Sequence, residues 1–294
     1  MYFLKVYQEA QNFLLEIKIG TRGSPLALAQ TKIICDEIIS SWPDLKTKII
    51  PIKTSGDKNM SPFLKNNNNK GMFTFEIERA LLNHEIDFAV HSLKDLPVNI
   101  NEFLPIVAYS RRGNPFDALV GSELKIGSSS LRRRLQLEKL FPASKILPVR
   151  GNINTRISKL DSGEFSGLVL AASGLERLGL ENRISKIFNE NEILPAPGQA
   201  VLACQGRKDE DYFYLECVND KNSVDCAKAE RSFARALNAG CNAPVGAYAK
   251  IFNDELTLKG LYIDDEKNFY RGKISGSRNE AEKLGEILAK EIFS

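Results

Sequence analysis

The 294-residue sequence lacks several features that would indicate a membrane-spanning, metal-binding or secreted protein. No run of 18 apolar residues occurs, which argues against a spanning helix. The two histidines, His84 and His91, have no ligand-type spacing with cysteine, and this disfavours a zinc site. The five cysteines form no Cys-x-x-Cys pair and are odd in number, which favours reduced thiols. Residues 1–16 lack the basic start and cleavage site of a signal peptide, so we interpret them as an extension of a cytoplasmic protein.

Glycine-rich phosphate loops and a strong net charge are also missing. Neither Gly-x-x-x-x-Gly-Lys nor Gly-x-Gly-x-x-Gly is present, which disfavours nucleotide binding. The formal net charge is only +3 and few aromatic residues lie beside the arginines, which argues against a nucleic-acid-binding protein. The composition, with 43% hydrophobic and 26% charged residues, is typical of a globular protein, and the length predicts two or three domains.

One α/β pattern occurs twice along the chain. In the first region, a strand over 17–21 precedes a helix with Ser24 at its N-cap and Pro25 at its first position, and strands over 48–52 and 86–90 follow. In the second region, a strand at 125–127 precedes a helix over 131–141, a strand over 145–149, a helix capped by Thr155 and a strand over 168–170. We therefore expect two α/β lobes around a cleft, joined by crossing segments at 110–115 and 194–199.

The last part of the chain follows a different pattern. A helix over 227–237 precedes three alternating segments at 247–251, 256–263 and 270–274, and an amphipathic helix over 280–292 ends the chain. This order predicts a small α+β domain. The predicted domains are lobe 1 over 1–112 and 200–220, lobe 2 over 113–199, and the C-terminal domain over 221–294.

Basic side chains gather at one predicted edge of the two lobes, where strands end and helices begin. They are Arg22, Lys65, Lys70, Lys94, Arg132, Arg133, Arg150, Arg156 and Arg177. Helix N-termini carry partial positive charge, so basic side chains there oppose the helix dipole unless an anion compensates. Arginine binds carboxylates and phosphates bidentately, and the pattern does not separate these two ligands. The same edge holds Asp95, a carboxylate able to stabilise a developing cation or move a proton.

Six motifs, in order, resemble those of the porphobilinogen deaminase family, also called hydroxymethylbilane synthases. They are residues 19–27 (IGTRGSPLA), 91–97 (HSLKDLP), 129–133 (SSLRR), 150–156 (RGNINTR), 195–199 (PAPGQ) and 240–241 (GC). The resemblance runs from about residue 17 to the C-terminus. It implies two lobes similar to periplasmic binding proteins and a third α+β domain. The chain departs from the family pattern at Asn66 to Asn69, Ala200, Gln205 and Ala239, none of which has an assigned chemical role.

The resemblance also implies an activity, which is the condensation of four porphobilinogens head to tail, with release of ammonia, to linear hydroxymethylbilane for tetrapyrrole and haem synthesis. It implies a monomer that binds porphobilinogen and the growing polypyrrole chain, without metal, nucleic acid or membrane. A dipyrromethane cofactor would be held by a thioether to Cys241, with Asp95 as the catalytic carboxylate. The implied cofactor-binding residues are Ser24, Lys94, Ser129, Arg132 and Arg133, and the implied substrate-binding residues are Arg22, Lys65, Lys70, Arg150, Arg156 and Arg177.

The sequence leaves two other functional classes of protein as alternatives. One is a non-enzymatic two-lobed anion-binding protein, against which stand the missing signal peptide and the third domain with Cys241. The other is a nucleic-acid binder that uses the arginine-rich edge. A covalent adduct separates these classes, because only the enzyme requires one.

Overall fold

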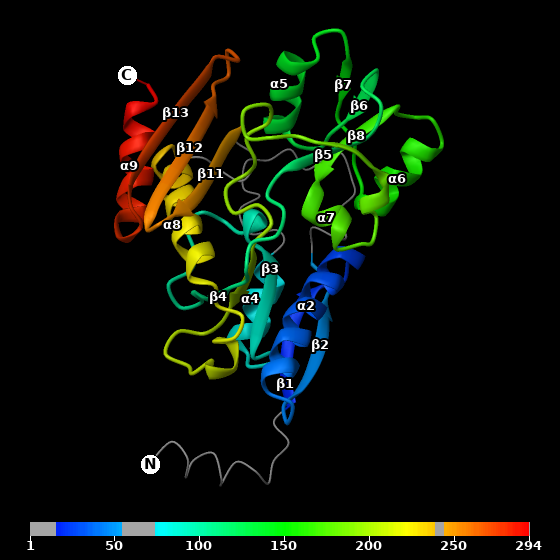
Figure 1. Ribbon diagram of the computed structural model, residues 1–294. Helices are drawn as coiled ribbons and strands as arrows, with labels where there is room; N and C mark the ends of the chain where they lie inside the picture. Colours follow the sequence, from blue (N-terminus) through cyan, green and yellow to red (C-terminus); the bar gives the residue numbers. More distant parts are fainter. Residues whose placement is uncertain (1–15, 55–73, 239–243, 294) are drawn as a thin grey trace.

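The computed structural model describes residues 16–54, 74–238 and 244–293 (Figure 1). A five-stranded sheet organises the first lobe, with the strand order β2-β1-β3-β10-β4. β1 pairs in parallel with β2 and β3, whereas β10 is antiparallel to both β3 and β4. The strands are β1 (Glu16–Arg22), β2 (Lys46–Ile52), β3 (Phe88–Ser92), β4 (Ile106–Tyr109) and β10 (Leu202–Gln205).

The second lobe repeats this topology with the strand order β7-β6-β8-β5-β9. β6 pairs in parallel with β7 and β8, and β5 is antiparallel to β8 and β9. The strands are β5 (Asp117–Gly121), β6 (Lys125–Gly127), β7 (Lys145–Leu147), β8 (Gly167–Ala171) and β9 (Ile184–Ile187). In each lobe the fourth strand of the sheet, β10 or β5, is antiparallel to its neighbours and directly follows a segment that has crossed from the other lobe. The prediction of one α/β plan used twice is confirmed.

Helices cover the sheets of both lobes, and the N-termini of three of them are capped by side chains. Ser24 Oγ accepts from the Ala27 N–H at 3.3 Å, as predicted for the first helix. The helix expected from Thr155 begins earlier, because Asn152 Oδ1 accepts from the Thr155 N–H at 2.9 Å and is the N-cap. No helix within the described ranges has the length and apolar character needed to cross a membrane. The α-helices of the lobes are α2 (Pro25–Ser41), α4 (Phe75–Leu82), α5 (Leu131–Leu140), α6 (Ile153–Asp161) and α7 (Ala172–Glu176), and the 3₁₀ helices are η2 (Leu93–Asp95), η3 (Glu181–Arg183) and η4 (Phe213–Leu215).

The C-terminal part is an antiparallel three-stranded sheet with two helices on one face (Figure 1). Its core includes Phe233, Leu258 and Leu284, all of them buried between the helices and the sheet. Its elements are α8 (Lys221–Ala236), β11 (Val245–Phe252), β12 (Glu255–Ile263), β13 (Phe269–Ser277), η5 (Arg278–Glu280) and α9 (Ala281–Glu291). The predicted fold class, two α/β lobes and a small α+β domain, is confirmed, while the residue boundaries of the three domains stay a proposal.

An ion pair between the buried Glu230 and the largely buried Arg112 connects both crossing segments to the C-terminal domain. Glu230 on α8 is 0% exposed, and its Oε1 accepts from Arg112 Nη1 at 2.6 Å and from the Ala249 N–H at 2.7 Å. Its Oε2 accepts from the Gly198 N–H at 2.7 Å, and Arg112 Nε donates to the Gln199 carbonyl at 3.0 Å. One carboxylate therefore contacts the first crossing segment, the second crossing segment and β11.

Candidate functional site

Two adjacent arginines in the first turn of α5 share one buried carboxylate. Arg132 and Arg133 are 4% and 6% exposed, and Asp117 at the start of β5 is 0% exposed. Arg132 Nη2 donates to Asp117 Oδ2 at 2.9 Å, and Arg133 Nη2 donates to Asp117 Oδ1 at 2.7 Å. The Ser130 hydroxyl caps the helix at this point by accepting from the Arg133 N–H at 3.4 Å. The helix start therefore fixes both guanidinium groups against β5.

Gln199 joins this arrangement to the first lobe. Its Oε1 accepts from Lys94 Nζ on η2 and from Arg133 Nη2, both at 3.3 Å. Its Nε2 donates to Asp117 Oδ1 at 2.8 Å and to the Pro115 carbonyl at 2.7 Å. The two lobes and both crossing segments thus meet in one hydrogen-bonded group. We call it the cationic cluster, and it consists of Lys94, Asp117, Arg132, Arg133 and Gln199.

The cationic cluster contains three cations and one carboxylate. Burial alone would raise the pKa of Asp117, but Arg133 and Arg132 hold it well below its usual range, so this carboxylate stays charged. Burial and then the Arg133 charge lower the pKa of Lys94 to about 8. Arg133 Nε is buried and has no hydrogen-bond partner among the residues that the structure describes. A ligand carrying carboxylates would balance the charge and offer acceptors to such donors.

Further arginines of the second lobe follow the neighbouring strands. Arg156 on α6 donates from Nε to the Gly151 carbonyl at 2.8 Å, and burial and the Arg133 charge lower its pKa. Arg177, directly after α7, donates to the Ala200 carbonyl at 2.7 Å, and burial lowers its pKa to about 10. Arg150 and Ser129 are exposed in the loops after β7 and β6.

The first lobe contributes residues from the carboxyl ends of β1 and β3. Arg22 is the last residue of β1, and Ser24 caps α2 two residues later. Asp95 ends η2, directly after Lys94 and three residues beyond β3, where its side chain is exposed. Within the described residues the Asp95 carboxylate has no hydrogen bond or ion pair, which leaves it accessible to a ligand.

Three predicted site residues, Lys65, Lys70 and Cys241, lie outside the described residues. The other four cysteines form no disulfide: Cys217 is exposed, and the remaining three are buried. Burial raises the pKa of Cys204 and that of Cys226, the latter to about 12, so neither is an activated thiol. In the portion of the chain with described coordinates, no group of three or more His, Cys, Asp or Glu side chains could hold a metal ion.

Three polar residues that contact the basic side chains directly or through the backbone were not predicted as site residues: Asp117, Gln199 and Gln136. Asp117 could have been noticed, because a single acidic residue opens the apolar run 117–120 and a buried carboxylate requires a partner. Gln199 was recognised only as part of a motif. Gln136 had no sequence signal beyond its place in the helix predicted over 131–141.

Comparison with known proteins identifies one family. The family model "Porphobilinogen deaminase, dipyromethane cofactor binding domain" matches residues 17–214, and the model "Porphobilinogen deaminase, C-terminal domain" matches residues 224–294. A porphobilinogen deaminase of Ruminiclostridium josui is 45% identical and covers 95% of this chain and 98% of its own length. Another, from Thermus thermophilus, is 42% identical and covers 94% of this chain and 95% of its own length.

Among solved structures, a TRAP solute-binding protein of an unidentified marine microbe, specific for aromatic acid ligands, aligns at a TM-score of 0.39 and 8% identity. The alignment covers 70% of this chain and 74% of that protein, and the likeness is too weak to carry an argument. The family models, in contrast, account for nearly all of the sequence from residue 17 onward, with both types of domain in their expected order. This chain therefore belongs to the porphobilinogen deaminase family.

Proposed function

We propose that the cationic cluster, Asp95 and the neighbouring arginines are the site at which this hydroxymethylbilane synthase holds its dipyrromethane cofactor and condenses porphobilinogen. The enzyme joins four porphobilinogens head to tail and releases ammonia at each step. Its product is linear hydroxymethylbilane, a precursor in tetrapyrrole biosynthesis. The observation that carries the site assignment is an excess of positive charge, with half-buried Lys94 and buried Arg132 and Arg133 near the single carboxylate of Asp117.

The cofactor's carboxylates match the donors of the cationic cluster. Lys94, Arg132 and Arg133 would hold these groups, with the Ser24 and Ser129 hydroxyls as further donors. When bound, the dipyrromethane supplies the pyrrole end to which the chain is added. Arg132 and Arg133 are held rigidly by Asp117 and by backbone carbonyls, so they bind without losing much side-chain freedom.

Asp95, which directly follows Lys94 of the cationic cluster, is the carboxylate that we assign to the reacting pyrrole. Loss of ammonia from porphobilinogen leaves positive charge shared with the pyrrole nitrogen, and a fixed carboxylate beside it stabilises that charge. The same carboxylate can accept the proton that leaves the ring carbon. Asp95 is accessible, whereas the other carboxylate of this region, Asp117, is committed to two arginines. The two acidic residues therefore have different tasks.

The remaining basic residues would bind the acetate and propionate groups of incoming porphobilinogen and of the growing chain. Each pyrrole unit carries two carboxylates, so elongation to a hexapyrrole requires several cationic partners. The pKa of Arg177, although lowered to about 10, leaves it charged at neutral pH. We assign this task to Arg22, Lys65, Lys70, Arg150, Arg156 and Arg177.

Intact mass tests this function and separates it from non-enzymatic anion binding and from nucleic-acid binding. We expect the purified chain to carry one covalent dipyrromethane, which gives a colour with Ehrlich's aldehyde reagent and which is absent, together with activity, from Cys241→Ser. Cys217→Ser is the matched control, because Cys217 is the exposed member of the other four cysteines, and it should stay loaded and active. A loaded Cys241→Ser protein would contradict the attachment site. Wild-type protein that is active without an adduct would contradict the proposal of a covalent dipyrromethane cofactor.

The lowered pKa of Lys94 predicts a pH dependence of anion binding. Because the Lys94 ammonium loses its proton as the pH rises through about 8, a full-length Cys241→Ala protein should bind porphobilinogen more weakly above that pH. The loss should be up to about tenfold per pH unit if the ammonium is needed for binding. Isothermal calorimetry checks this, and Lys94→Arg, whose charge persists, should remove the step. An unchanged affinity of the Lys94-containing protein across this range would count against the role of Lys94.

We further propose that the protein is a cytoplasmic monomer that needs no metal or nucleic acid. The unbonded cysteines of the described chain support a reducing compartment. Light scattering of the purified protein and metal analysis of the active enzyme test the oligomeric state and the metal content.

A further inference from the structure

Gln136 lies on α5 one turn after Arg132 and uses both atoms of its buried side-chain amide. It is 2% exposed. Its Oε1 accepts from the Leu194 N–H at 2.8 Å, and its Nε2 donates to the Leu194 carbonyl at 3.2 Å. Nε2 also lies 3.2 Å from the Arg132 backbone carbonyl. The amide thus binds both backbone groups of Leu194, as a neighbouring strand would.

The Leu194 carbonyl that Gln136 holds is also an acceptor for Arg132. Arg132 Nη1 donates to this carbonyl, while Nη2 of the same guanidinium donates to Asp117. The orientation of the Arg132 guanidinium therefore depends on two acceptors, Asp117 and the Leu194 carbonyl. Gln136 fixes the position of the second. Without the Gln136 amide, the Leu194 N–H would lose its acceptor and the carbonyl would lose a donor that fixes its position.

Leu194 also opens the second crossing segment, which brings Gln199 to the cationic cluster. Between Leu194 and Gln199 the chain contains Pro195 and Pro197, whose rings fix φ and limit the paths that the backbone can follow. The Pro195 carbonyl is held in turn by the Ala247 N–H at 2.9 Å. Fixing Leu194 consequently helps to set where the Gln199 amide meets Lys94 and Arg133.

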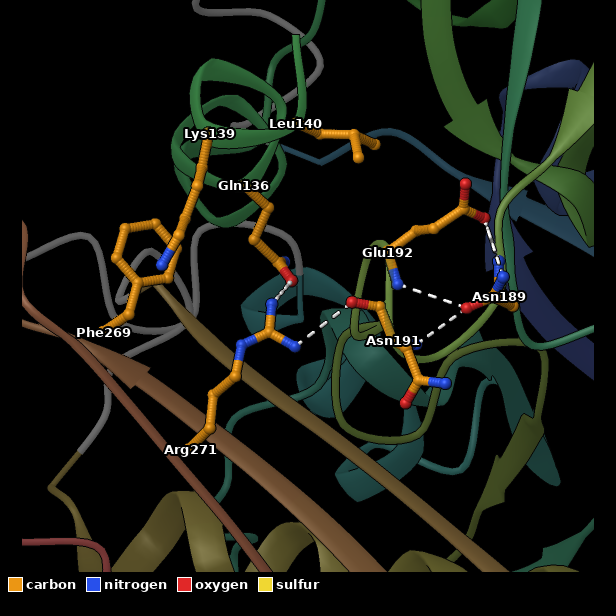
Figure 2. A pocket seen from close by; sticks show the side chains of 8 residues that line it. All are labelled: Gln136, Lys139, Leu140, Asn189, Asn191, Glu192, Phe269 and Arg271. Carbon is orange, nitrogen blue, oxygen red and sulfur yellow. Dashed lines mark hydrogen bonds between the residues drawn. The ribbon is translucent and has the colours of Figure 1, made fainter. Parts of the chain in front are cut away.

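The outer side of the Gln136 amide faces the C-terminal domain. Arg271 on β13 donates from Nη2 to Gln136 Oε1 at 3.2 Å and from Nη1 to the Asn191 carbonyl at 3.4 Å (Figure 2). These residues line a pocket of about 450 Å³ between α5 and β13. Arg271 is exposed, so this contact is peripheral compared with the buried contacts of Gln136 to Leu194.

We propose that Gln136 is a positioning residue for the carboxylate-binding site, because it fixes the Leu194 carbonyl that orients Arg132. It does not touch the substrate and acts through Arg132. This inference rests on the proposed function of the cationic cluster. It predicts that removing the amide weakens the binding of a carboxylated pyrrole only as long as Arg132 is present.

A double-mutant cycle in the full-length Cys241→Ala protein tests this dependence, with porphobilinogen as the probe and calorimetry as the measurement. Gln136→Leu should weaken binding about tenfold, because the displaced Leu194 carbonyl would no longer hold its hydrogen bond to the charged Arg132 guanidinium. Arg132→Leu should weaken it more, and the double variant should bind no more weakly than Arg132→Leu alone. Effects of the two substitutions that multiply would overturn the proposal, because Gln136 would then not act through Arg132.

Two controls separate positioning from a general loss of stability. Ser232→Ala removes a buried hydroxyl that donates to the Glu282 carbonyl at 2.8 Å within the C-terminal domain, and it should lower the melting temperature without changing affinity. Arg271→Gln removes only the peripheral contact and should change affinity less than Gln136→Leu. If Gln136→Leu does not fold, Gln136→Glu, which keeps the acceptor and the size but not the donor, is measured in the same cycle.

The outcomes distinguish this inference from the proposed function. If Arg132→Leu weakens porphobilinogen binding but neither Gln136 variant does, the cationic cluster is supported and the positioning role is wrong. If Arg132→Leu leaves the affinity unchanged, the proposed role of the cationic cluster fails, and the positioning role fails with it.

Discussion

Replacing Asp95 with asparagine is expected to slow porphobilinogen condensation on the order of 100-fold or more, as the loss of a preorganised electrostatic group does in other enzymes. The substitution keeps the shape of the side chain and removes its charge. Because Asp95 is exposed at the end of η2 and its carboxylate makes no hydrogen bond or ion pair with the other described residues, the fold and the cofactor content should be unaffected. Single-turnover measurement of ammonia release from the loaded variant checks the effect on chemistry apart from loading.

Two variants provide controls for Asp95→Asn. Asp95→Glu keeps the charge but displaces it, so it should retain more activity than the asparagine variant. Glu102→Gln removes an exposed carboxylate seven residues further along the chain and should leave the rate unchanged. Condensation by Asp95→Asn at nearly the wild-type rate would mean that Asp95 is not the catalytic carboxylate. Asp117 would be a poor replacement, since two arginines already bind it.

Strands that belong to an apolar pattern within one lobe could be predicted. The strands β5 and β10, which each follow a crossing segment from the other lobe, could not. β1, β2 and α2 have clear apolar patterns bounded by polar residues, and they form close to the expected positions. β5 and β10 are short, buried on both faces and not alternating, so their sequences do not distinguish a strand from a buried loop. Their antiparallel pairing also depends on the path of the chain between the lobes, which no local pattern contains.

The candidate site, like the fold, has a part that could be predicted from the sequence and a part that could not. Basic residues such as Arg132 could be identified from their places at strand and helix ends. The groups that orient them could not, because Asp117, Leu194 and Gln199 reach α5 from distant parts of the chain. A buried polar residue is tolerated in the fold when it has a hydrogen-bonding or charged partner, and here these partners come from distant parts of the chain. Sequence patterns therefore predicted the charge of the site but not how that charge is held.

The buried pair of Arg112 and Glu230 gives the largest expected effect on stability. Glu230→Gln should lower the free energy of unfolding by about 3–5 kcal/mol, the typical cost of removing one partner of a buried ion pair. The Arg112 guanidinium, whose side chain is only 14% exposed, would then lack its counter-charge. In addition, an amide nitrogen would replace one of the two oxygens that accept from the Gly198 and Ala249 N–H groups. Urea denaturation at neutral pH, followed by far-UV circular dichroism, measures the change.

An exposed pair provides the matched control for Glu230→Gln. Glu280 lies 2.8 Å from Lys283, with both side chains more than half exposed, so Glu280→Gln should cost less than about 1 kcal/mol. Equal effects of the two substitutions would show that the Arg112–Glu230 pair contributes no more than a surface pair.

Because Gly198 directly precedes Gln199, we also expect Glu230→Gln to lower the fraction of chains that carry the cofactor. The same carboxylate that stabilises the C-terminal domain would then also hold the second crossing segment where Gln199 can contact Lys94 and Arg133.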